Sequence, residues 1–326
     1  MRVLRWPGDK PEQAPRLAAV GAFDGLHRGH QRVAAELCGR ARQHGLQSCL
    51  VTFEPTPTQV FSKEPPYNLR LTTEAERLRL LEVFCLHEVC ILDFSRPELR
   101  ATKAADFVRD VLHDWLGAKA ICGASDHRMG SDHAGWDELA EIAHGLGMEA
   151  IVLPAELGPG GVVSSTKIRE LVWEGRMEEA AGLLGRDYTV LAEVEAGQQV
   201  GRELGFPTAN LAVPAEKLLP PEGVYAGWAQ GEALGHGPLE APGFEGAWPA
   251  ATNIGRCPTI GENRERTFEA HVLDWAGDAY GAEITVGLMR RLRGEECFPS
   301  QKALVRQIAD DVAAVRELAA GAYARI

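Results

Sequence analysis

The chain has 326 residues, of which 45% are hydrophobic and 25% are charged, and its formal net charge is −12. This length predicts two domains, because one domain usually spans roughly 100 to 200 residues. The composition excludes a disordered, collagen-like or coiled-coil chain. Both halves carry more acidic than basic residues, so nucleic acid or an anionic membrane would meet a repulsive field. We therefore expect small molecules as partners, phosphorylated ones included.

The apolar runs and the cysteines indicate the cellular location of the protein. No apolar run reaches the roughly 18 to 20 residues of a membrane span, and the N-terminal stretch lacks the apolar segment of a signal peptide. The seven cysteines form no C-x-x-C pair, which predicts reduced core residues rather than disulfides or a zinc site. We expect a cytoplasmic protein, and a homo-oligomer is left open.

The first half of the chain alternates apolar runs with helical periods. The runs that predict buried strands are 17–22, 49–53, 88–94, 118–122 and 150–153. The segments with helical spacing are 30–44, 73–86, 104–116, 136–146 and 165–184. This alternation predicts an α/β domain with a doubly wound parallel sheet covered on both faces. In such sheets ligands lie off the carboxyl ends of the strands.

The second half has a different pattern. Short strands cut by glycine and proline run over 188–292, and the stretch 230–248 is typical of a long hairpin loop. Helical spacing returns at 300–320. These features predict an antiparallel β-barrel followed by a terminal helix. The predicted domains are therefore 1–185 and 186–326.

The motif GAFDGLHRGH joins the first predicted strand of the sheet to a helix, and it carries His27 and His30. A spacing of three places both imidazoles on one face of the first helical turn. Free amides and the positive end of the helix dipole favour phosphate at that turn. The alternative is a glycine-rich turn with two surface histidines.

A second helix start lies in the motif VVSSTKIR. Ser165 and Thr166 are good capping residues, so simple helix capping is one interpretation. The other is that these hydroxyls, with Arg169, bind a triphosphate. Two helix starts suited to anions in one α/β domain favour a nucleotide ligand.

The motif GRELGFPTAN is the first in the second half of the chain with candidate functional residues. Glycine and proline around Thr208 and Asn210 predict a fixed loop that offers a hydroxyl and an amide oxygen. Such hard ligands suit Mg²⁺ beside nucleotide phosphates. The alternative is a barrel turn that is merely rich in turn-forming residues.

Taken together, the motifs resemble those of the prokaryotic bifunctional riboflavin kinase/FAD synthetase family over nearly the whole chain. The first-half motifs of the resemblance are GAFDGLHRGHQ, VTFEPTP, RLTT and VSSTKIRE. The second-half motifs are GRELGFPTAN, GVYA, TNIGRCPT, FEAH and DAYG. The resemblance implies a nucleotidyltransferase-type domain followed by a riboflavin kinase barrel. Its substrates would be riboflavin, FMN and ATP, with Mg²⁺ present.

For the first domain the resemblance implies that the FMN phosphate attacks the α-phosphorus of ATP and expels pyrophosphate. His27 and His30 would stabilise the charge on the transferring phosphates without a covalent enzyme intermediate. The other residues implied here are Gly21, Phe23, Asp24, Ser165, Thr166 and Arg169 for the nucleotide and Asp126 for the flavin.

For the second domain the resemblance implies a kinase whose base is Glu269 in the strand-like FEAHVLDW. The carboxylate would accept the proton of the ribityl primary hydroxyl. The remaining implied residues are Gly201, Arg202, Thr208 and Asn210 for the nucleotide, the last two also for the metal, and Arg293 for the flavin. Trp275 and Phe298 are further candidates for the flavin wall, although an aromatic residue in a barrel is more often core.

Three positions depart from the family pattern. Thr56 stands where the pattern has histidine, Val162 where arginine or lysine is common, and the stretch 124–130 lacks two phenylalanines. These changes remove donors near the phosphates, so we expect slow FAD synthesis that histidine at 56 and arginine at 162 would raise. Two alternatives follow. One is a kinase whose first domain is inactive or uses another acceptor, and the other is a flavin-binding protein without turnover.

Overall fold

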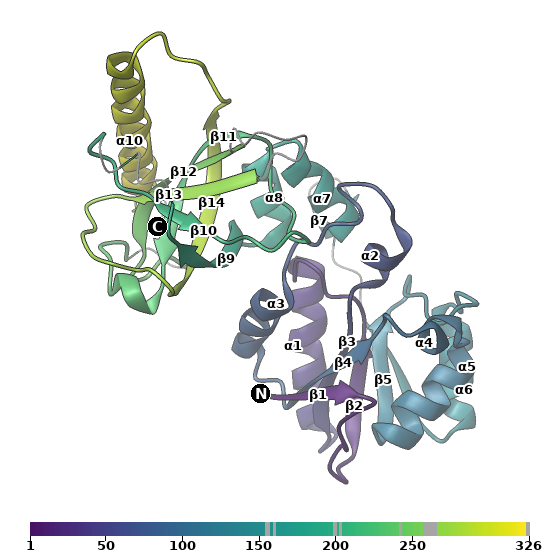
Figure 1. The fold of residues 1–326 in the computed structure, drawn as a ribbon. Helices are drawn as coiled ribbons and strands as arrows, with labels where there is room; N and C mark the ends of the chain where they lie inside the picture. Colours follow the sequence, from purple (N-terminus) through teal and green to yellow (C-terminus); the bar gives the residue numbers. More distant parts are fainter. Residues whose placement is uncertain are drawn as a thin grey trace. The chain divides into compact units, whose positions relative to one another are not determined.

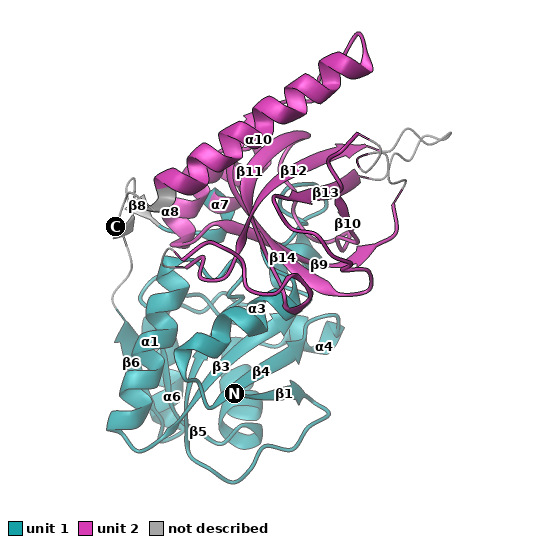
Figure 2. Cartoon of the chain, turned by 90° about the vertical axis from the view of Figure 1, so that its left-hand side faces the viewer, with its two compact units in different colours: residues 1–167 teal, residues 168–326 magenta. Residues whose placement is uncertain are grey.

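The computed structural model describes residues 1–153, 157–158, 161–197, 201, 204–240, 243–256 and 266–323. The chain folds as two compact units, residues 1–167 and 168–326 (Figure 2). Among the described residues, no helix is both long enough and apolar enough to cross a membrane.

A six-stranded sheet forms the centre of the first unit, and all its neighbouring strands are parallel. In spatial order they are β1 (Arg2–Trp6), β4 (Glu88–Asp93), β3 (Gln47–Glu54), β2 (Arg16–Val20), β5 (Ala118–Ala124) and β6 (Glu149–Leu153) (Figure 1). The order reverses at β2, because β3 lies on one side of it and β5 on the other. Ligands of such sheets bind off the carboxyl ends of the strands at this reversal.

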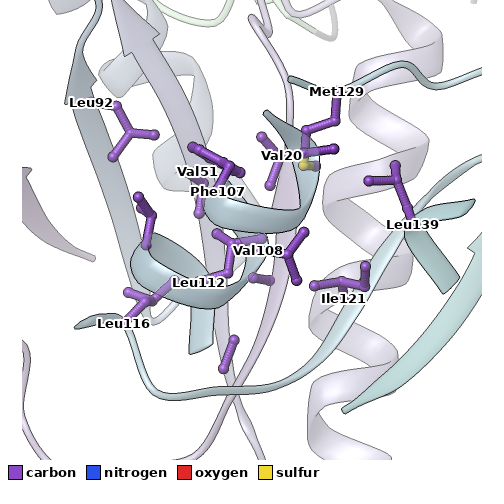
Figure 3. Close-up of a cluster of buried hydrophobic side chains, with 14 of the residues drawn as sticks. Val20, Val51, Leu92, Phe107, Val108, Leu112, Leu116, Ile121, Met129 and Leu139 are labelled. Carbon is purple, nitrogen blue, oxygen red and sulfur yellow. The ribbon is translucent and has the colours of Figure 1, made fainter. Parts of the chain in front are cut away.

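Helices cover both faces of this sheet. On one face α1 (Arg28–Gln43) and α3 (Glu74–Leu81) pack on strand residues that include Leu17. On the other face the π-helical η2 (Phe107–Trp115) and α6 (Trp136–Gly145) pack on a cluster that is drawn in Figure 3. Consecutive β2 residues enter opposite clusters, as the two-residue period of a strand requires. The predicted doubly wound sheet is confirmed.

Several short elements of the first unit escaped the sequence prediction. They are β1, α2 (Pro57–Phe61), α4 (Pro97–Ala101) and the hairpin β7 (Leu157–Gly158) and β8 (Gly161–Val162). Each has five residues or fewer. A segment of that length does not complete enough periods for its hydrophobic pattern to be recognised. The remaining short elements are α5 (Ala104–Asp106) and the 3₁₀ turn η1 (Glu82–Phe84).

The second unit is a closed antiparallel barrel, as predicted. Its strands, in order around the barrel, are β10 (Ala209–Leu211), β13 (Arg266–Val272), β12 (Trp248–Arg256), β11 (Gly223–Gln230), β14 (Glu283–Arg293) and β9 (Tyr188–Glu195). The predicted loop between β11 and β12 contains one 3₁₀ turn, η3 (Glu232–Leu234). The terminal helix α10 (Gln301–Tyr323) packs on the outer face of the barrel, where Val315 meets Ala226 and Leu273.

The helical stretch predicted at 165–184 is two helices rather than one. α7 (Ser165–Trp173) ends before Gly175, whose φ of 75° lies in the left-handed region, and α8 (Met177–Leu184) follows. Glycine takes that conformation without steric cost, so the chain turns there. α8 groups with the barrel, and its Glu178 accepts hydrogen bonds from Arg290 of β14.

The cysteines of the described residues are all free. Cys49, Cys90 and Cys122 are buried in strands of the sheet, as expected. Cys85 and Cys297 are exposed, so the expectation of a core position is wrong for these two. Cys85 follows η1 at the surface, and Cys297 precedes α10 outside any strand.

Candidate active sites

The loop 21–27 follows β2 and lies at the point where the strand order reverses. Its backbone is unusual, because φ is 49° at Phe23, 79° at Gly25 and 37° at Leu26. Non-glycine residues adopt such angles only where the surroundings hold them there, and such positions cluster at functional sites. The tight turn brings the chain from the end of β2 directly into the start of α1.

Asp24 holds this loop against residues 71 and 72. Its carboxylate accepts hydrogen bonds from Leu71 N at 3.0 Å, Thr72 N at 2.9 Å and Thr72 Oγ1 at 3.1 Å. Thr72 Oγ1 also accepts a hydrogen bond from Gly25 N at 3.0 Å. Asp24 is 1% exposed, so these hydrogen bonds shape the loop. Its contact with a nucleotide stays a prediction.

Two buried arginines form hydrogen bonds that support the loop 21–27. Arg77 donates to Ala22 O at 2.9 Å and to Glu54 Oε2 at 2.9 Å, and burial lowers the pKa of its guanidinium. Arg70 forms a bidentate pair with Glu54 at 2.6 and 2.9 Å. Sequence reasoning named the motif around Arg70 but missed Arg77. The signal was a basic residue at a buried position of a predicted helix.

His27 and His30 lie together at the start of α1. The His27 Nδ1 atom caps the helix by accepting from His30 N at 3.4 Å, and the two rings stack with centroids 3.6 Å apart. The first turn of α1 contains no acidic residue. The positive end of the helix dipole and the two imidazoles favour an anion at this end of α1, and anion binding by His27 and His30 stays a prediction.

The second predicted anion-binding helix start, that of α7, lies beside this loop. Ser165 Oγ donates to Asp24 O at 2.8 Å, while Ser164 Oγ accepts from Lys167 N at 3.3 Å. Capping and the bond to the loop are thus made by different serines. Thr166 is exposed and Arg169 is buried in α7. The hydrogen bond from Ser165 joins the two motifs into one site.

Of the positions that depart from the family pattern, Thr56 has a structural task of its own. Thr56 is fully buried and forms a capping box for α2 with Gln59. Asp126 is exposed in the loop after β5, whose carboxyl end neighbours that of β2. Burial lowers the pKa of His127 in the same loop. Val162 belongs to β8, and its side chain lies outside the described residues.

The second unit contains a cavity of about 750 Å³ on the outer side of the barrel, beside α10. Its lining includes five predicted residues, Gly201, Thr208, Glu269, Arg293 and Phe298. The polar residues of the lining that sequence reasoning missed are Asn253, His271, Glu295, Glu296 and Asp311. These come from β12, β13, the segment before α10, and α10 itself, so no single motif announced them. Two of them lie in motifs of the resemblance, Asn253 in TNIGRCPT and His271 in FEAH.

Glu269 lies at the centre of a polar row across three strands. In the strand register it stands between Asn210 of β10 and Asn253 of β12, and paired residues project from the same face. Thr208 Oγ1 donates to its Oε2 atom at 3.4 Å. Burial raises the pKa of the Glu269 carboxyl, and the hydrogen bond from Thr208 opposes that shift. A half-buried carboxylate with a raised pKa suits a general base.

The other predicted flavin residue of this cavity is held by a buried ion pair. Arg293 donates to the Asp311 carboxylate at 2.9 to 3.2 Å, which ties β14 to α10. Its guanidinium also lies 5.5 Å from the centroid of the Phe298 ring. Arg293 thus lines the cavity with its charge already paired. A contact with flavin stays a prediction.

A second cavity, of about 320 Å³, opens on the other side of Thr208. Its lining includes Trp275, Asp278 and Tyr280. Thr208 lines both cavities, whereas Glu269 lines only the larger one. Two ligands can therefore meet at Thr208, with the carboxylate on the side of the larger cavity.

The remaining predicted kinase residues are Gly201, Asn210 and Arg202. Gly201 lines the larger cavity, and a Cβ there would lie 2.4 Å from Phe206 O, so only glycine fits. The Asn210 amide packs against Gly197. Arg202 lies outside the described residues.

The oxygen donors suit Mg²⁺ bound through a nucleotide. Among the described residues no group of three or more His, Cys, Asp or Glu side chains could hold a metal ion by itself. Mg²⁺ usually takes one or two protein oxygens and fills its shell with water and substrate phosphates. Thr208 directly precedes β10 and Asn210 lies within it, so these two oxygen donors are two residues apart along the chain. The residues present therefore fit such a metal.

Comparison with known proteins bears on both units. An FAD synthetase family model matches residues 9–167, and a riboflavin kinase model matches residues 184–319. A bifunctional riboflavin kinase/FMN adenylyltransferase of Pseudomonas fluorescens is 37% identical over 95% of each chain. The chain belongs to the bifunctional riboflavin kinase/FMN adenylyltransferase family. The Escherichia coli K12 member is 34% identical over 94% of each chain.

A solved structure shares the fold of this family member over nearly its whole length. It is a Streptococcus pneumoniae crystal structure described as a macrolide-efflux protein, with 26% identity and a TM-score of 0.83. The match covers 97% of this chain and 99% of that chain. The two family models leave residues 168–183 between them.

Proposed function

We propose that the protein phosphorylates riboflavin to FMN with ATP in its second unit and adenylylates FMN to FAD in its first. The observation that carries this proposal is the position of Thr208, which joins the two cavities of the barrel beside the carboxylate of Glu269. The helix starts of α1 and α7, brought together by the hydrogen bond from Ser165 to Asp24, support a separate phosphate site in the first unit. Family models for both activities support this proposal over the alternative of an inactive first unit.

In the kinase reaction the larger cavity holds riboflavin and the smaller one holds ATP. Glu269 faces only the larger cavity, so the group whose proton it accepts must be there. That group is the ribityl primary hydroxyl, whose oxygen attacks the γ-phosphorus while ADP leaves. The carboxylate takes the proton in the same step. Phe298 supplies an aromatic surface for the isoalloxazine ring.

Thr208 and Asn210 are the residues that hold Mg²⁺ in this scheme. When bound, the metal neutralises charge on the β- and γ-phosphates. Thr208 also orients Glu269 through its hydrogen bond, which keeps one carboxylate oxygen engaged and leaves the other for the substrate. ATP use follows from family membership, whereas the metal requirement rests on these donors.

In the adenylyl transfer an FMN phosphate oxygen attacks the α-phosphorus of ATP, and pyrophosphate leaves. His27 and His30 stabilise the charge that develops on the phosphates, together with the amides at the start of α1. Ser165, Thr166 and Arg169 bind the β- and γ-phosphates from α7. The first unit positions both substrates and forms no bond to them.

We also propose a cytoplasmic location, where flavin and ATP are both available. The free cysteines of the described residues agree with a reducing compartment. The partners are riboflavin, FMN and ATP, with neither nucleic acid nor membrane, and a homo-oligomer stays open.

The experiment that tests the function is an incubation of the purified chain with riboflavin, Mg²⁺ and ATP, followed by separation of the flavins. The proposal expects FMN to appear first and FAD to follow. FMN without FAD would favour the inactive first unit, and unchanged riboflavin with tight binding would favour a flavin-binding protein.

A further inference from the structure

His271 makes a hydrogen bond that the kinase scheme has not yet used. Its Nδ1 atom lies 2.7 Å from the carbonyl oxygen of Pro207. A carbonyl oxygen can only accept a hydrogen bond, so Nδ1 carries the proton and donates it. The His271 ring also meets the Phe206 ring edge to face, with centroids 5.6 Å apart. Residues 206 and 207 are therefore both in contact with His271.

Among the described residues, few other hydrogen bonds fix the segment before β10. β10 has only three residues, and its ladder pairs begin at Ala209. Phe206 N donates to Gly201 O at 2.8 Å, while proline has no N–H to offer. The bond from His271 thus fixes the peptide unit directly before Thr208.

β13 carries both Glu269 and His271, two residues apart on one face. β13 therefore positions the base, which is Glu269 itself, and it positions the segment with Thr208 through His271. The distance from Thr208 Oγ1 to Glu269 is 3.4 Å, close to the upper limit for a hydrogen bond. A small movement of residues 207 and 208 breaks that contact.

We propose that His271 is a positioning residue of the kinase, which holds Thr208 in register with Glu269 through its hydrogen bond to Pro207. This inference rests on the proposed kinase function. It assigns His271 no proton transfer to or from the substrate. It predicts that kcat for FMN formation depends more on the hydrogen-bond donor at Nδ1 than on the aromatic ring.

Two substitutions separate the donor from the ring. His271→Phe keeps an aromatic ring beside Phe206 and removes the donor, whereas His271→Asn keeps an N–H near the Nδ1 position and removes the ring. We expect His271→Phe to lower kcat for FMN formation about tenfold, since a displacement of about 1 Å at a reacting centre can cost about a hundredfold. We expect His271→Asn to stay within about threefold of the wild type, and the KM for riboflavin to change little in both.

Two controls keep the test specific. FAD formation from added FMN uses the other unit and reports the amount of enzyme in the assay, so it should be unchanged in both variants, while the melting temperature of the barrel reports its folding. His236→Phe makes the same replacement at an exposed histidine of the barrel, outside both cavity linings, and should leave FMN formation unchanged.

The inference is overturned if His271→Phe forms FMN at the wild-type rate, or if His271→Asn loses as much activity as His271→Phe. It is also overturned if the loss appears only as a lower melting temperature with an unchanged kcat. Absence of FMN formation in the wild type would instead contradict the kinase function itself.

Discussion

At the scale of single residues, the environment of Glu269 determines how the kinase responds to pH. Burial raises the pKa of its carboxyl above the ordinary value. The base must be ionised, so the kinase rate should fall on acidification at a higher pH than for an exposed glutamate. For stability, a group whose pKa is raised by folding favours the folded state below its unfolded pKa. That contribution is lost as the pH rises through the folded pKa.

Glu269→Gln tests both consequences. The amide keeps the shape but cannot accept a proton, so we expect FMN formation to slow by about 10² to 10⁴ while ATP and riboflavin still bind. Because the amide stays neutral, the variant should gain stability over the wild type at neutral pH but not near pH 4. Stopped assays, calorimetric binding and melting curves measure these effects. Wild-type turnover in this variant would remove the base role from Glu269.

Thr208 and Asn210 can be tested through the metal. We expect Thr208→Ala and Asn210→Ala each to raise the Mg²⁺ concentration needed for half-maximal FMN formation and to lower the rate, because a hard oxygen ligand is lost beside the phosphates. The barrel should keep its melting temperature within a few degrees. An unchanged Mg²⁺ dependence in both variants would show that the metal is held elsewhere.

At the scale of elements, one position that departs from the family pattern caps the helix α2. The Thr56 hydroxyl accepts a hydrogen bond from Gln59 N, and Gln59 Oε1 accepts one from Thr56 N at 3.0 Å. The two residues therefore form a capping box at the start of α2. The side chain is fully buried. The family pattern predicts a phosphate ligand at position 56, and in this chain Thr56 begins a helix.

We therefore expect Thr56→His to destabilise the first unit by about 2 kcal/mol, through the lost cap and an overfilled site. It should give no gain in FAD synthesis. Thr56→Ser keeps the capping oxygen and serves as the matched control, with a smaller loss. Thermal unfolding and FAD assays measure both. Faster FAD synthesis in Thr56→His would restore the earlier interpretation of a missing ligand.

The long elements and the motif residues were predictable from the sequence, and the contacts that complete the sites were not. Buried strands such as β3 and amphipathic helices such as α1 can be recognised from the period and length of their hydrophobic patterns. Arg77 donates to Ala22, 55 residues away along the chain, and Asp311 pairs with Arg293, 18 residues away. No local pattern predicts such a contact. The break at Gly175 was missed because the hydrophobic pattern continues through it.

At the scale of the whole molecule, two activities are assigned to two separately folded units. We keep the boundary near residue 185 as the prediction for where the kinase fold begins. α8 then lies before that fold and packs on it, with Met177, Ala180 and Leu184 buried. Its pairing between Glu178 and Arg290 is exposed and contributes little.

This arrangement predicts a difference between two fragments. A fragment of residues 168–326 should be more stable than one of residues 186–326 by at least about 2 kcal/mol, because the shorter one exposes the apolar surface that α8 covers. Both should form FMN, since neither loses a residue of the two cavities. Denaturant titration measures the difference. Equal stability would show that α8 does not support the barrel.

The central claim is that two separate sites make FMN and FAD in sequence, and one time course tests it most directly. Wild type, Glu269→Gln and the double variant His27→Ala/His30→Ala are each incubated with riboflavin, ATP and Mg²⁺, and all flavins are quantified. We predict that the wild type forms FMN and then FAD, and that Glu269→Gln forms neither but converts added FMN to FAD. The double variant should accumulate FMN without FAD, because losing even one donor to a developing oxyanion costs about 10² to 10³ in rate. FAD formation by the double variant at the wild-type rate, or loss of both reactions in either variant despite correct folding, would contradict the account.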